Sequence, residues 1–320
     1  MNFRILNKDE YAYWDDFVDS SPQGSIYAKS YYLDSKDCDF EINIIERDRK
    51  ILGGIILCRN ELKIYSNPLF VKYLGVLYAD DDLIGVKSKR RKNKIDRILL
   101  KNIKLESIFS YEFHPNFDNW LSFYWNKFNQ TTKYTYQIWF DSENSFRESY
   151  TSKVRGPLEN AKKYNLRIVE IGIKEFCETI DKSYFARNTK PPYKKDDLIK
   201  FLNNLLIHDC FYYRAVVDSN NNVHAAAGIV YNKNSSNLIL NGSDPEYRKY
   251  CGNTLIIDHM IEFSSDKSKI FDFEGSMHER IEHFYFGFGG ELVSYFSISK
   301  NNFFTKLYLS LLSFLKFMYK

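Results

Sequence analysis

The sequence predicts an α+β fold with two domains, and three observations carry this prediction. The chain has 320 residues, about twice the size of a common domain. Hydrophobic residues make up 44% of it and charged residues 27%, as in globular proteins. In the second half, three strand patterns in close succession precede a helix, a strand, a helix and a strand, an order typical of α+β units rather than of doubly wound sheets.

The first half mixes strands and helices. Trp14, Phe17 and Val18 recur at helical spacing after a short strand at 3–5, and the turn-forming run at 20–24 ends that helix. The other predicted elements are helices at 29–36, 90–103 and 118–128 and strands at 40–47, 50–59, 62–65, 107–113 and 134–140, with a bulge at Gly53-Gly54.

The second half repeats the mixture. The polar run at 218–222 is an ordinary hairpin connection between two strands. The predicted helices are 145–164, 174–186, 195–207, 253–263 and 279–286, and the predicted strands are 167–171, 211–217, 223–231, 237–241, 270–273 and 291–299. We therefore expect domains at 1–150 and 151–302, followed by a hydrophobic and basic helix at 303–320.

Charge and cysteine content exclude several classes of protein. The 45 basic and 41 acidic residues leave a net charge of +4 and a pI near 8.5, short of a strongly basic nucleic-acid binder. The dense basic run at 87–94 is expected to be a solvated helix start, with a phosphate-bearing substrate or an acidic membrane surface as the functional alternative. Five cysteines and six histidines show no metal-ligand spacing, so we expect reduced thiols, no metal and no tightly bound cofactor.

The sequence predicts a cytoplasmic protein, because it starts without a signal-peptide pattern and has no apolar run of the ~20 residues that span a bilayer. The tail at 303–320 would form a helix of about 27 Å, too short to span. It is expected to pack on the protein or to lie at the inner face of the membrane with its lysines toward anionic head groups.

Two acidic residues near the C-terminal end are candidates for chemistry. Asp272 and Glu274 alternate with phenylalanines in a predicted strand, so both carboxylates are expected on one face. Gly275 allows a sharp turn at the strand end, where open sheets commonly bind ligands. A solvated strand edge is the alternative interpretation.

Several motifs resemble the FemAB-type acyltransferases, a branch of the GNAT superfamily with two GNAT-like domains of mixed, mostly antiparallel sheets flanked by helices. The opening around Trp14 and the junction from Arg155 to Ile168 are similar to that family, in the family's order. The most specific resemblance is to its "DF-x-G-S … F-K-x-G-F-G" end, carried by Phe271-Asp272-Phe273-Glu274-Gly275-Ser276 and Phe284-Tyr285-Phe286-Gly287-Phe288-Gly289-Gly290.

The resemblance implies transfer of an acyl group to an amine, with backbone N–H groups and a tyrosine hydroxyl stabilising the oxyanion. It makes Asp272 and Glu274 candidates for the general base, with Tyr285 standing where the family has Lys; a packed aromatic is the alternative for Tyr285. An approximate GNAT diphosphate loop assigns acyl-CoA binding to Arg248, Lys249, Gly252, Asn253 and Thr254, although a plain helix cap has the same pattern.

The resemblance also implies a substrate site. Lys36, Arg187 and Tyr193 fall at substrate-binding positions of the family, while a solvated lysine and a connector loop are the alternatives. The predicted function is an N-acyltransferase that moves an acyl group from acetyl-CoA or a related acyl-CoA, as cosubstrate, to an amine of a sugar or cell-envelope precursor. The alternatives are an aminoacyl-tRNA-dependent peptidoglycan cross-bridge enzyme and a non-catalytic glycan or nucleotide binding module.

Overall fold

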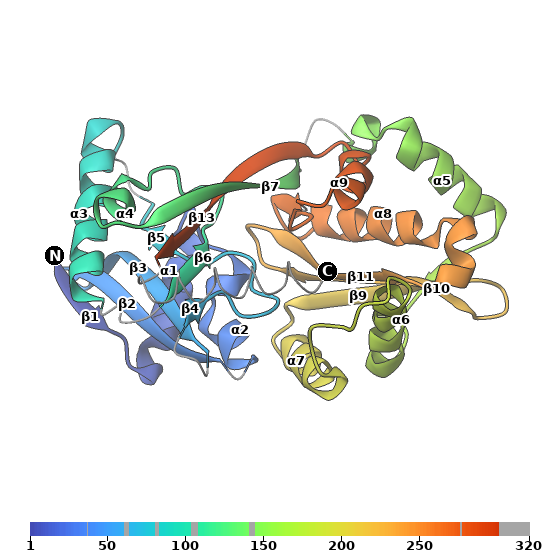
Figure 1. Cartoon of the computed structure of the whole chain (residues 1–320), viewed down its shortest axis with the longest axis horizontal. Coiled ribbons are helices and arrows are strands. Elements are labelled where there is room, and N and C mark those ends of the chain that lie inside the picture. The colour runs from blue at the N-terminus through green and yellow to red at the C-terminus, as the bar shows by residue number, and fades with distance from the viewer. Residues whose placement is uncertain are drawn as a thin grey trace, which may run out of the picture. The chain divides into compact units, whose positions relative to one another are not determined.

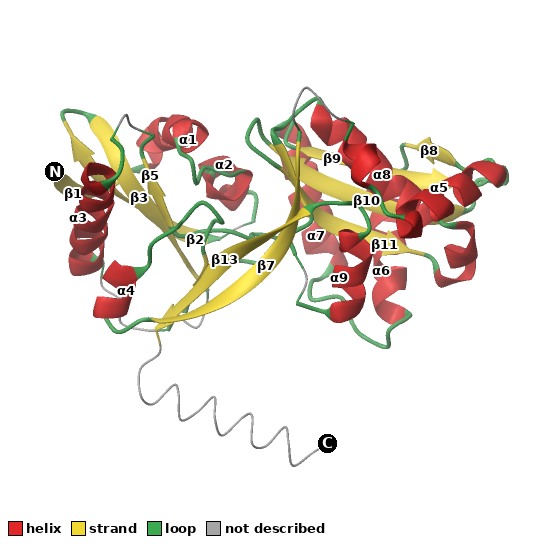
Figure 2. Cartoon of the chain, turned by 90° about the horizontal axis from the view of Figure 1, so that it is seen from above, coloured by secondary structure: helices red, strands yellow, loops and turns green. Residues whose placement is uncertain are grey.

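The computed structural model describes residues 1–36, 38–60, 64–80, 83–103, 108–140, 145–275 and 277–300. The chain divides into two compact units. Of the described residues, unit 1 comprises those in Met1–Lys133 and 294–300, and unit 2 those in Tyr134–Val293. Figures 1 and 2 show the elements of both units.

Unit 1 is a mixed sheet with helices packed on it. The sheet order is β1-β2-β3-β4-β6-β13, with β5 paired to β3. Among the described strands of this unit, every pairing is antiparallel except that of β4 with β6. Its strands are β1 (Asn2–Ile5), β2 (Asp39–Arg47), β3 (Lys50–Arg59), β4 (Tyr65–Ser66), β5 (Val76–Tyr78), β6 (Phe109–Glu112) and the end of β13 (Glu291–Lys300), and its helices are α1 (Tyr11–Ser20), α2 (Ser30–Asp34), α3 (Val86–Asn102) and α4 (Leu121–Trp125), with 3₁₀ turns at Lys8–Glu10 and Ile26–Ala28.

Unit 2 is built on the strands β7-β12-β11-β10-β9-β8, which neighbour one another in this order and of which only β11 and β12 pair in parallel. The strands are β7 (Asn129–Trp139), β8 (Arg167–Val169), β9 (Phe211–Val217), β10 (Val223–Tyr231), β11 (Ser236–Ser243) and β12 (Ile270–Asp272). The helices are α5 (Ser152–Lys163), α6 (Ile173–Phe185), α7 (Lys195–Ile207), α8 (Gly252–Ser265) and α9 (Glu279–Phe286), with 3₁₀ turns at Phe146–Ser149 and Pro245–Tyr250.

The core of unit 2 lies between its sheet and α8. Figure 1 shows α8 on one face of the β9-β10-β11 strands and α6 with α7 on the other. Ile256 and Met260 of α8 are completely buried against Phe271 and Phe273 of the β12 region and Phe288 after α9. Burying each such side chain contributes about 1.5–3 kcal/mol. The apolar pattern that predicted these elements therefore also fixes where β12 and α9 sit.

The structure confirms the predicted α+β class and most of the elements, with several differences. The helix expected at 118–128 is limited to α4. The strand expected at 62–65 is described only from residue 64 onward, where β4 occupies Tyr65–Ser66. The three-residue strand β5 was not predicted. The helix expected at 145–164 is two pieces, because the backbone of Tyr150 and Thr151 is extended and buried Tyr150 donates a 2.9 Å hydrogen bond to Asp258. The bulge expected at Gly53-Gly54 falls at Leu52, which is skipped in the pairing of β3 with β2.

The division into units differs from the expected boundary near residue 150. The first unit ends at Lys133, and the chain returns to it at Ser294. The helix expected at 303–320 lies outside the described residues. In the part of the chain that the structure describes, no helix is both long and apolar enough to cross a bilayer.

Candidate active site

The site begins where two parallel strands of unit 2 part. β11 and β12 pair only at Ser236 with Phe271 and Asn237 with Asp272. β12 then ends, whereas β11 continues to Ser243. In the pairing of β10 with β11, Gly228 lies opposite Leu240 and Ile229 opposite Leu238, so Ile239 is an extra residue on β11. Such a β-bulge bends the strand that contains it. Among the described strands, none pairs with 238–243 on the side that β12 leaves, so the backbone groups of that edge are open to a ligand.

A cavity of about 430 Å³ occupies this opening. That volume is in the usual range for small-molecule sites. Four segments of unit 2 form its walls. They are Leu238, Ile239, Leu240, Asn241, Gly242 and Ser243 of β11; Ile180, Ser183, Tyr184 and Arg187 in and after α6; Arg248 and Asn253 at the start of α8; and Ile281, Phe284 and Tyr285 of α9.

The wall formed by α6 is held tightly against β11. A Cβ on Gly242 would lie 2.7 Å from Ile180 Cα, so only glycine permits this approach. The Ser183 hydroxyl accepts a 2.6 Å hydrogen bond from the Ser243 N–H and donates one of 3.1 Å to the Ser243 carbonyl. These contacts fix the far end of β11 and therefore the width of the cavity.

The N-terminus of α8 supplies backbone donors to the cavity rim. Cys251 is left-handed, with φ 62° and ψ 21°, and the helix begins at Gly252. The amides of Thr254 and Leu255 already donate to the Cys251 carbonyl, at 3.1 and 3.3 Å. The earlier N–H groups of a helix carry its positive partial charge and suit an anion. Arg248, on the preceding turn, also lines the cavity.

Two amide oxygens in the cavity wall lack a partner. Oδ1 of Asn241 and Oδ1 of Asn253 are both shielded from solvent, and no hydrogen-bond donor among the described residues reaches either. A buried acceptor without a donor costs about 1–3 kcal/mol. A ligand that brings N–H or O–H groups would remove this cost.

Asp272 fixes the strand end rather than facing the cavity. The residue is 1% exposed, and its carboxylate accepts hydrogen bonds from Thr135 Oγ1 at 2.6 Å, Gln137 Nε2 at 2.8 Å and the Glu274 N–H at 2.6 Å. The expectation that Asp272 and Glu274 share one strand face is wrong, because β12 ends at Asp272 and Glu274 is left-handed at φ 59°. Gly275 follows at φ 71°, where a Cβ would lie 2.3 Å from the Tyr134 carbonyl oxygen.

Glu274 and Tyr285 form an interacting pair. Burial raises the pKa of Glu274 well above its ordinary 4.5. Burial, and then the nearby Glu274 carboxylate, raise the pKa of the Tyr285 phenol. The Tyr285 ring packs on Phe273, with centroids 4.7 Å apart, and Tyr285 lines the cavity. The raised pKa suits the Glu274 carboxylate to accept a proton nearer neutral pH. The raised pKa of Tyr285 keeps its phenol protonated, so the hydroxyl can donate a hydrogen bond.

The structure brings together only part of the predicted set. Arg187, Arg248, Asn253 and Tyr285 line one cavity, and Gly252 and Thr254 lie in the adjoining first turn of α8. The other five predicted residues do not line this cavity, and two of them, Asp272 and Glu274, lie at the end of β12 as described above. Lys249 Nζ lies 4.9 Å from the Tyr250 ring centroid, the Tyr193 hydroxyl donates a 2.9 Å hydrogen bond to Asp181, and Lys36, in unit 1, lies over the Phe70 ring at 4.9 Å.

A second cavity, of about 880 Å³, adjoins the first through Tyr184, Arg187 and Ile281. The loop after α6 and the start of α9 line it, with Thr189, Lys190, Pro192, His278 and Glu279. The sequence interpretation missed Asn241, Lys190 and His278. Asn241 had a signal, because it is a polar residue at the end of the apolar run Leu238–Leu240 and directly precedes a glycine. Among the described residues, no group of three or more His, Cys, Asp or Glu side chains is placed to hold a metal ion.

Solved structures of low sequence identity share this fold. FemX matches with a TM-score of 0.70 at 12% identity, over 92% of this chain and 97% of FemX. A tandem GNAT protein from the clavulanic acid biosynthesis pathway matches at 0.54 and 8% identity, over 93% and 98% of the two chains. The C-terminal domain of a putative lysylphosphatidylglycerol synthetase from Agrobacterium fabrum matches at 0.54 and 10% identity, over 95% of each chain. No protein-family model and no curated protein matches the sequence.

The likeness confirms the fold that the sequence resemblance implied. This chain has the α+β architecture of FemX and of tandem GNAT proteins over almost its whole length. At 8–12% identity the likeness concerns the fold, and activity has to be argued from the site itself.

Proposed function

We propose that the chain is an N-acyltransferase that uses an acyl-CoA thioester and an amine acceptor. The observation that carries the proposal is the cavity between the open edge of β11 and the start of α8. The extended pantetheine arm of coenzyme A contains amide groups, which can hydrogen-bond to an unpaired strand edge. Coenzyme A also carries a diphosphate, which suits a helix N-terminus. Arg248 would add positive charge beside that diphosphate, and the oxygens of Asn241 and Asn253 would accept from ligand N–H groups.

The site also offers groups for the proton transfers of this reaction. The neutral amine attacks the thioester carbonyl, the C–N bond forms, and the C–S bond breaks as the thiolate leaves. We assign Glu274 to accept the proton of the attacking amine, which then passes to the thiolate or to solvent and restores the carboxylate. Tyr285 stays neutral and is assigned to donate a hydrogen bond to the charge that develops on the reacting thioester. Asp272 is assigned a supporting role, because three donors already surround its carboxylate.

The second cavity suits the acceptor. Arg187 and Lys190 outnumber the one acidic residue of its lining, Glu279, so the cavity carries net positive charge, and Arg187 lies over the Tyr184 ring, 5.1 Å from its centroid. An acceptor with phosphate or carboxylate groups, such as a sugar or other cell-envelope precursor, would complement this charge. We place the reaction in the cytoplasm, where both acyl-CoA and such precursors are available.

Binding of the two candidate donors tests the proposal. Titration calorimetry of the full chain with acetyl-CoA should show saturable binding, and free CoA should compete because it retains the diphosphate and the amide chain. If an aminoacyl-tRNA binds and neither acetyl-CoA nor CoA does, the donor is aminoacyl-tRNA rather than acyl-CoA. Absence of binding by all three would contradict acyl transfer and favour a non-catalytic glycan or nucleotide binding module.

A further inference from the structure

A stripe of five basic residues runs along one exposed face of α3 in unit 1. Lys87, Arg90, Lys94, Arg97 and Lys101 follow one another at alternating steps of three and four, so they lie on a single helix face. All five are exposed. They extend over about 21 Å. The opposite face buries Ile95 and Leu99, so the helix cannot turn this stripe inward.

The stripe has no acidic partner among the described residues. None of the five forms an ion pair there. The neighbouring Lys92 is the contrast, because it lies on the side of α3 that faces 118–119 and approaches Asp118 at 3.8 Å. Five adjacent cations without counter-charges repel one another, and an anionic partner removes that repulsion.

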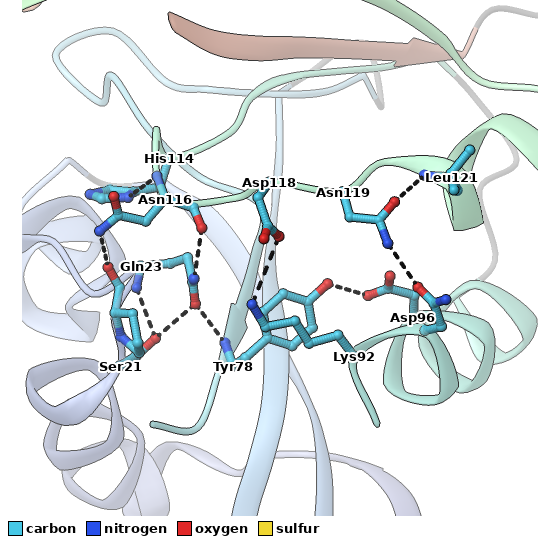
Figure 3. A network of polar contacts seen from close by, with 12 residues as sticks. Ser21, Gln23, Tyr78, Lys92, Asp96, His114, Asn116, Asp118, Asn119 and Leu121 are labelled. Atoms are coloured by element: carbon cyan, nitrogen blue, oxygen red, sulfur yellow. Dashed lines mark hydrogen bonds and ion pairs between the residues drawn. The ribbon is translucent and has the colours of Figure 1, made fainter. Parts of the chain in front are cut away.

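Polar contacts fasten α4 beside the stripe. Asn119 Nδ2 donates a 3.1 Å hydrogen bond to Asn93 Oδ1 of α3, and Asn119 Oδ1 accepts one of the same length from the Leu121 N–H, the first residue of α4. Figure 3 shows this network, and Figures 1 and 2 show the two helices side by side. The position of α4 relative to the basic face of α3 is thereby fixed.

The exposed face of α4 is apolar and aromatic. Leu121, Tyr124 and Trp125 are 46%, 57% and 50% exposed, and their spacing of three and four places them together on one face. The Trp125 ring lies 5.7 Å from the Arg97 guanidinium carbon, so this apolar face borders the basic stripe. At the other end of the stripe Val86 is 64% exposed.

We propose that this α3–α4 surface docks on an anionic lipid membrane. Basic side chains over lipid head groups, with aromatic and aliphatic side chains entering the interface between head groups and acyl chains, are the composition that membrane surfaces select. Charge complementarity alone would also suit RNA. The membrane is the partner that fits, because Val86 and Leu121 have no planar group to stack on a base but gain from burial in the interface. This inference does not depend on the proposed acyl transfer.

Flotation of the full chain with lipid vesicles tests the proposal. Vesicles of phosphatidylcholine with about 30% phosphatidylglycerol should retain the protein, vesicles of phosphatidylcholine alone should retain far less, and roughly 0.5 M salt should release it. The test variant replaces Lys87, Arg90, Lys94, Arg97 and Lys101 by Gln. The matched control replaces five exposed lysines elsewhere, Lys50, Lys153, Lys163, Lys174 and Lys269, by Gln, so both variants lose the same charge.

The test variant should bind the anionic vesicles at least about ten-fold more weakly, and the control should lose much less. Trp125→Ala, which leaves every charge in place, should also weaken binding several-fold. Equal loss in the two five-residue variants would overturn the proposal, as would failure of the unchanged chain to float. Binding of the stripe to RNA with no binding to vesicles would assign the surface to the other partner.

Discussion

The Tyr78 hydroxyl donates a 2.6 Å hydrogen bond to Asp96 Oδ1 in the interior of unit 1 (Figure 3). Asp96 is 1% exposed, and burial raises its pKa from 3.8 to about 7 despite the contact with Tyr78. The carboxyl is therefore protonated in the folded chain under conditions in which the unfolded chain has lost that proton.

The first prediction is that ionisation of Asp96 destabilises the protein as the pH rises. Below about pH 4 both states hold the proton, so stability is highest there with respect to this group, and it is lost as the pH passes through about 7. The difference between the two pKa values corresponds to an upper limit of roughly 4 kcal/mol. Asp96→Asn keeps an acceptor for Tyr78 and removes the titration, so its stability relative to the unchanged chain should grow with pH.

Urea unfolding of both proteins at about pH 5 and about pH 8 measures this difference. The exposed Asp266→Asn variant is the control and should show no such trend. A difference between Asp96→Asn and the unchanged chain that is the same at both pH values would mean that Asp96 does not titrate in this range.

The second prediction separates two adjacent cations. Arg248 lines the cavity, whereas the Lys249 ammonium lies over the Tyr250 ring. Arg248→Gln should weaken acetyl-CoA binding about ten-fold, or about 1.4 kcal/mol, because it removes charge beside the proposed diphosphate position. Lys249→Gln should change the affinity little. Calorimetric titration with acetyl-CoA measures both affinities, and equal effects of the two changes would reject this placement of the diphosphate.

Gly252→Glu would test the diphosphate position less cleanly than Arg248→Gln. A Cβ at Gly252 would lie 3.0 Å from His224 Cβ, so the substitution could disturb the fold as well as the binding of acetyl-CoA.

The third prediction concerns the pH dependence of acyl transfer. Burial raises the pKa of Glu274 well above 4.5, so a Glu274 base becomes active only as the pH rises through that higher value. Transfer should therefore fall on the acid side of the profile. Glu274→Gln should lower kcat by about 10²–10⁴-fold and remove that limb. The exposed Glu291→Gln variant should keep both the rate and the profile. A Glu274→Gln enzyme with an unchanged acid limb would assign the base elsewhere.

The fourth prediction compares two glycines. Gly275→Ala should cost more than about 2 kcal/mol of unfolding free energy, because φ is 71° and the new methyl would meet the Tyr134 carbonyl oxygen at 2.3 Å. Gly156→Ala, inside α5 with no atom within 4 Å of the new methyl, should stabilise by about 0.5–1 kcal/mol. Urea unfolding measures both. A Gly275→Ala protein as stable as the unchanged chain would show that the strand end relaxes freely.

Sequence periodicity predicted those elements that are long enough for their buried side chains to repeat at a helical or strand spacing. The predicted bounds of the helix at 195–207 match those of α7 at both ends, because Leu198, Phe201, Leu202 and Leu205 form a buried face of the correct period. The strand β5 has three residues, too few for any period to appear. Its buried side chains are specified by pairing with distant β3, which no local pattern records.

The candidate site was predicted in the same partial way. A helix start after glycine is visible in the sequence, and α8 begins at Gly252, one residue before the predicted start at 253. The end of β12 was not visible in the sequence. There Gly275 lies against the backbone of Tyr134 and Glu274 is left-handed, so the Glu274 side chain no longer follows the alternation of side chains along a strand. Likewise, the contact of Tyr193 with Asp181 comes from tertiary packing, and neither residue type signals the other.

The last strand of the structure has a consequence for how the chain is completed during synthesis. β13 pairs Ser297 with Glu112 and Ile298 with Tyr111 of β6, across the whole sequence of unit 2. A ribosome therefore releases nearly all of unit 2 before the strand that finishes unit 1 exists. Until then the β6 edge has open hydrogen-bonding groups, a state that favours chaperone binding or aggregation. Unit 1 is encoded first, yet its sheet is completed only after unit 2 has been synthesised.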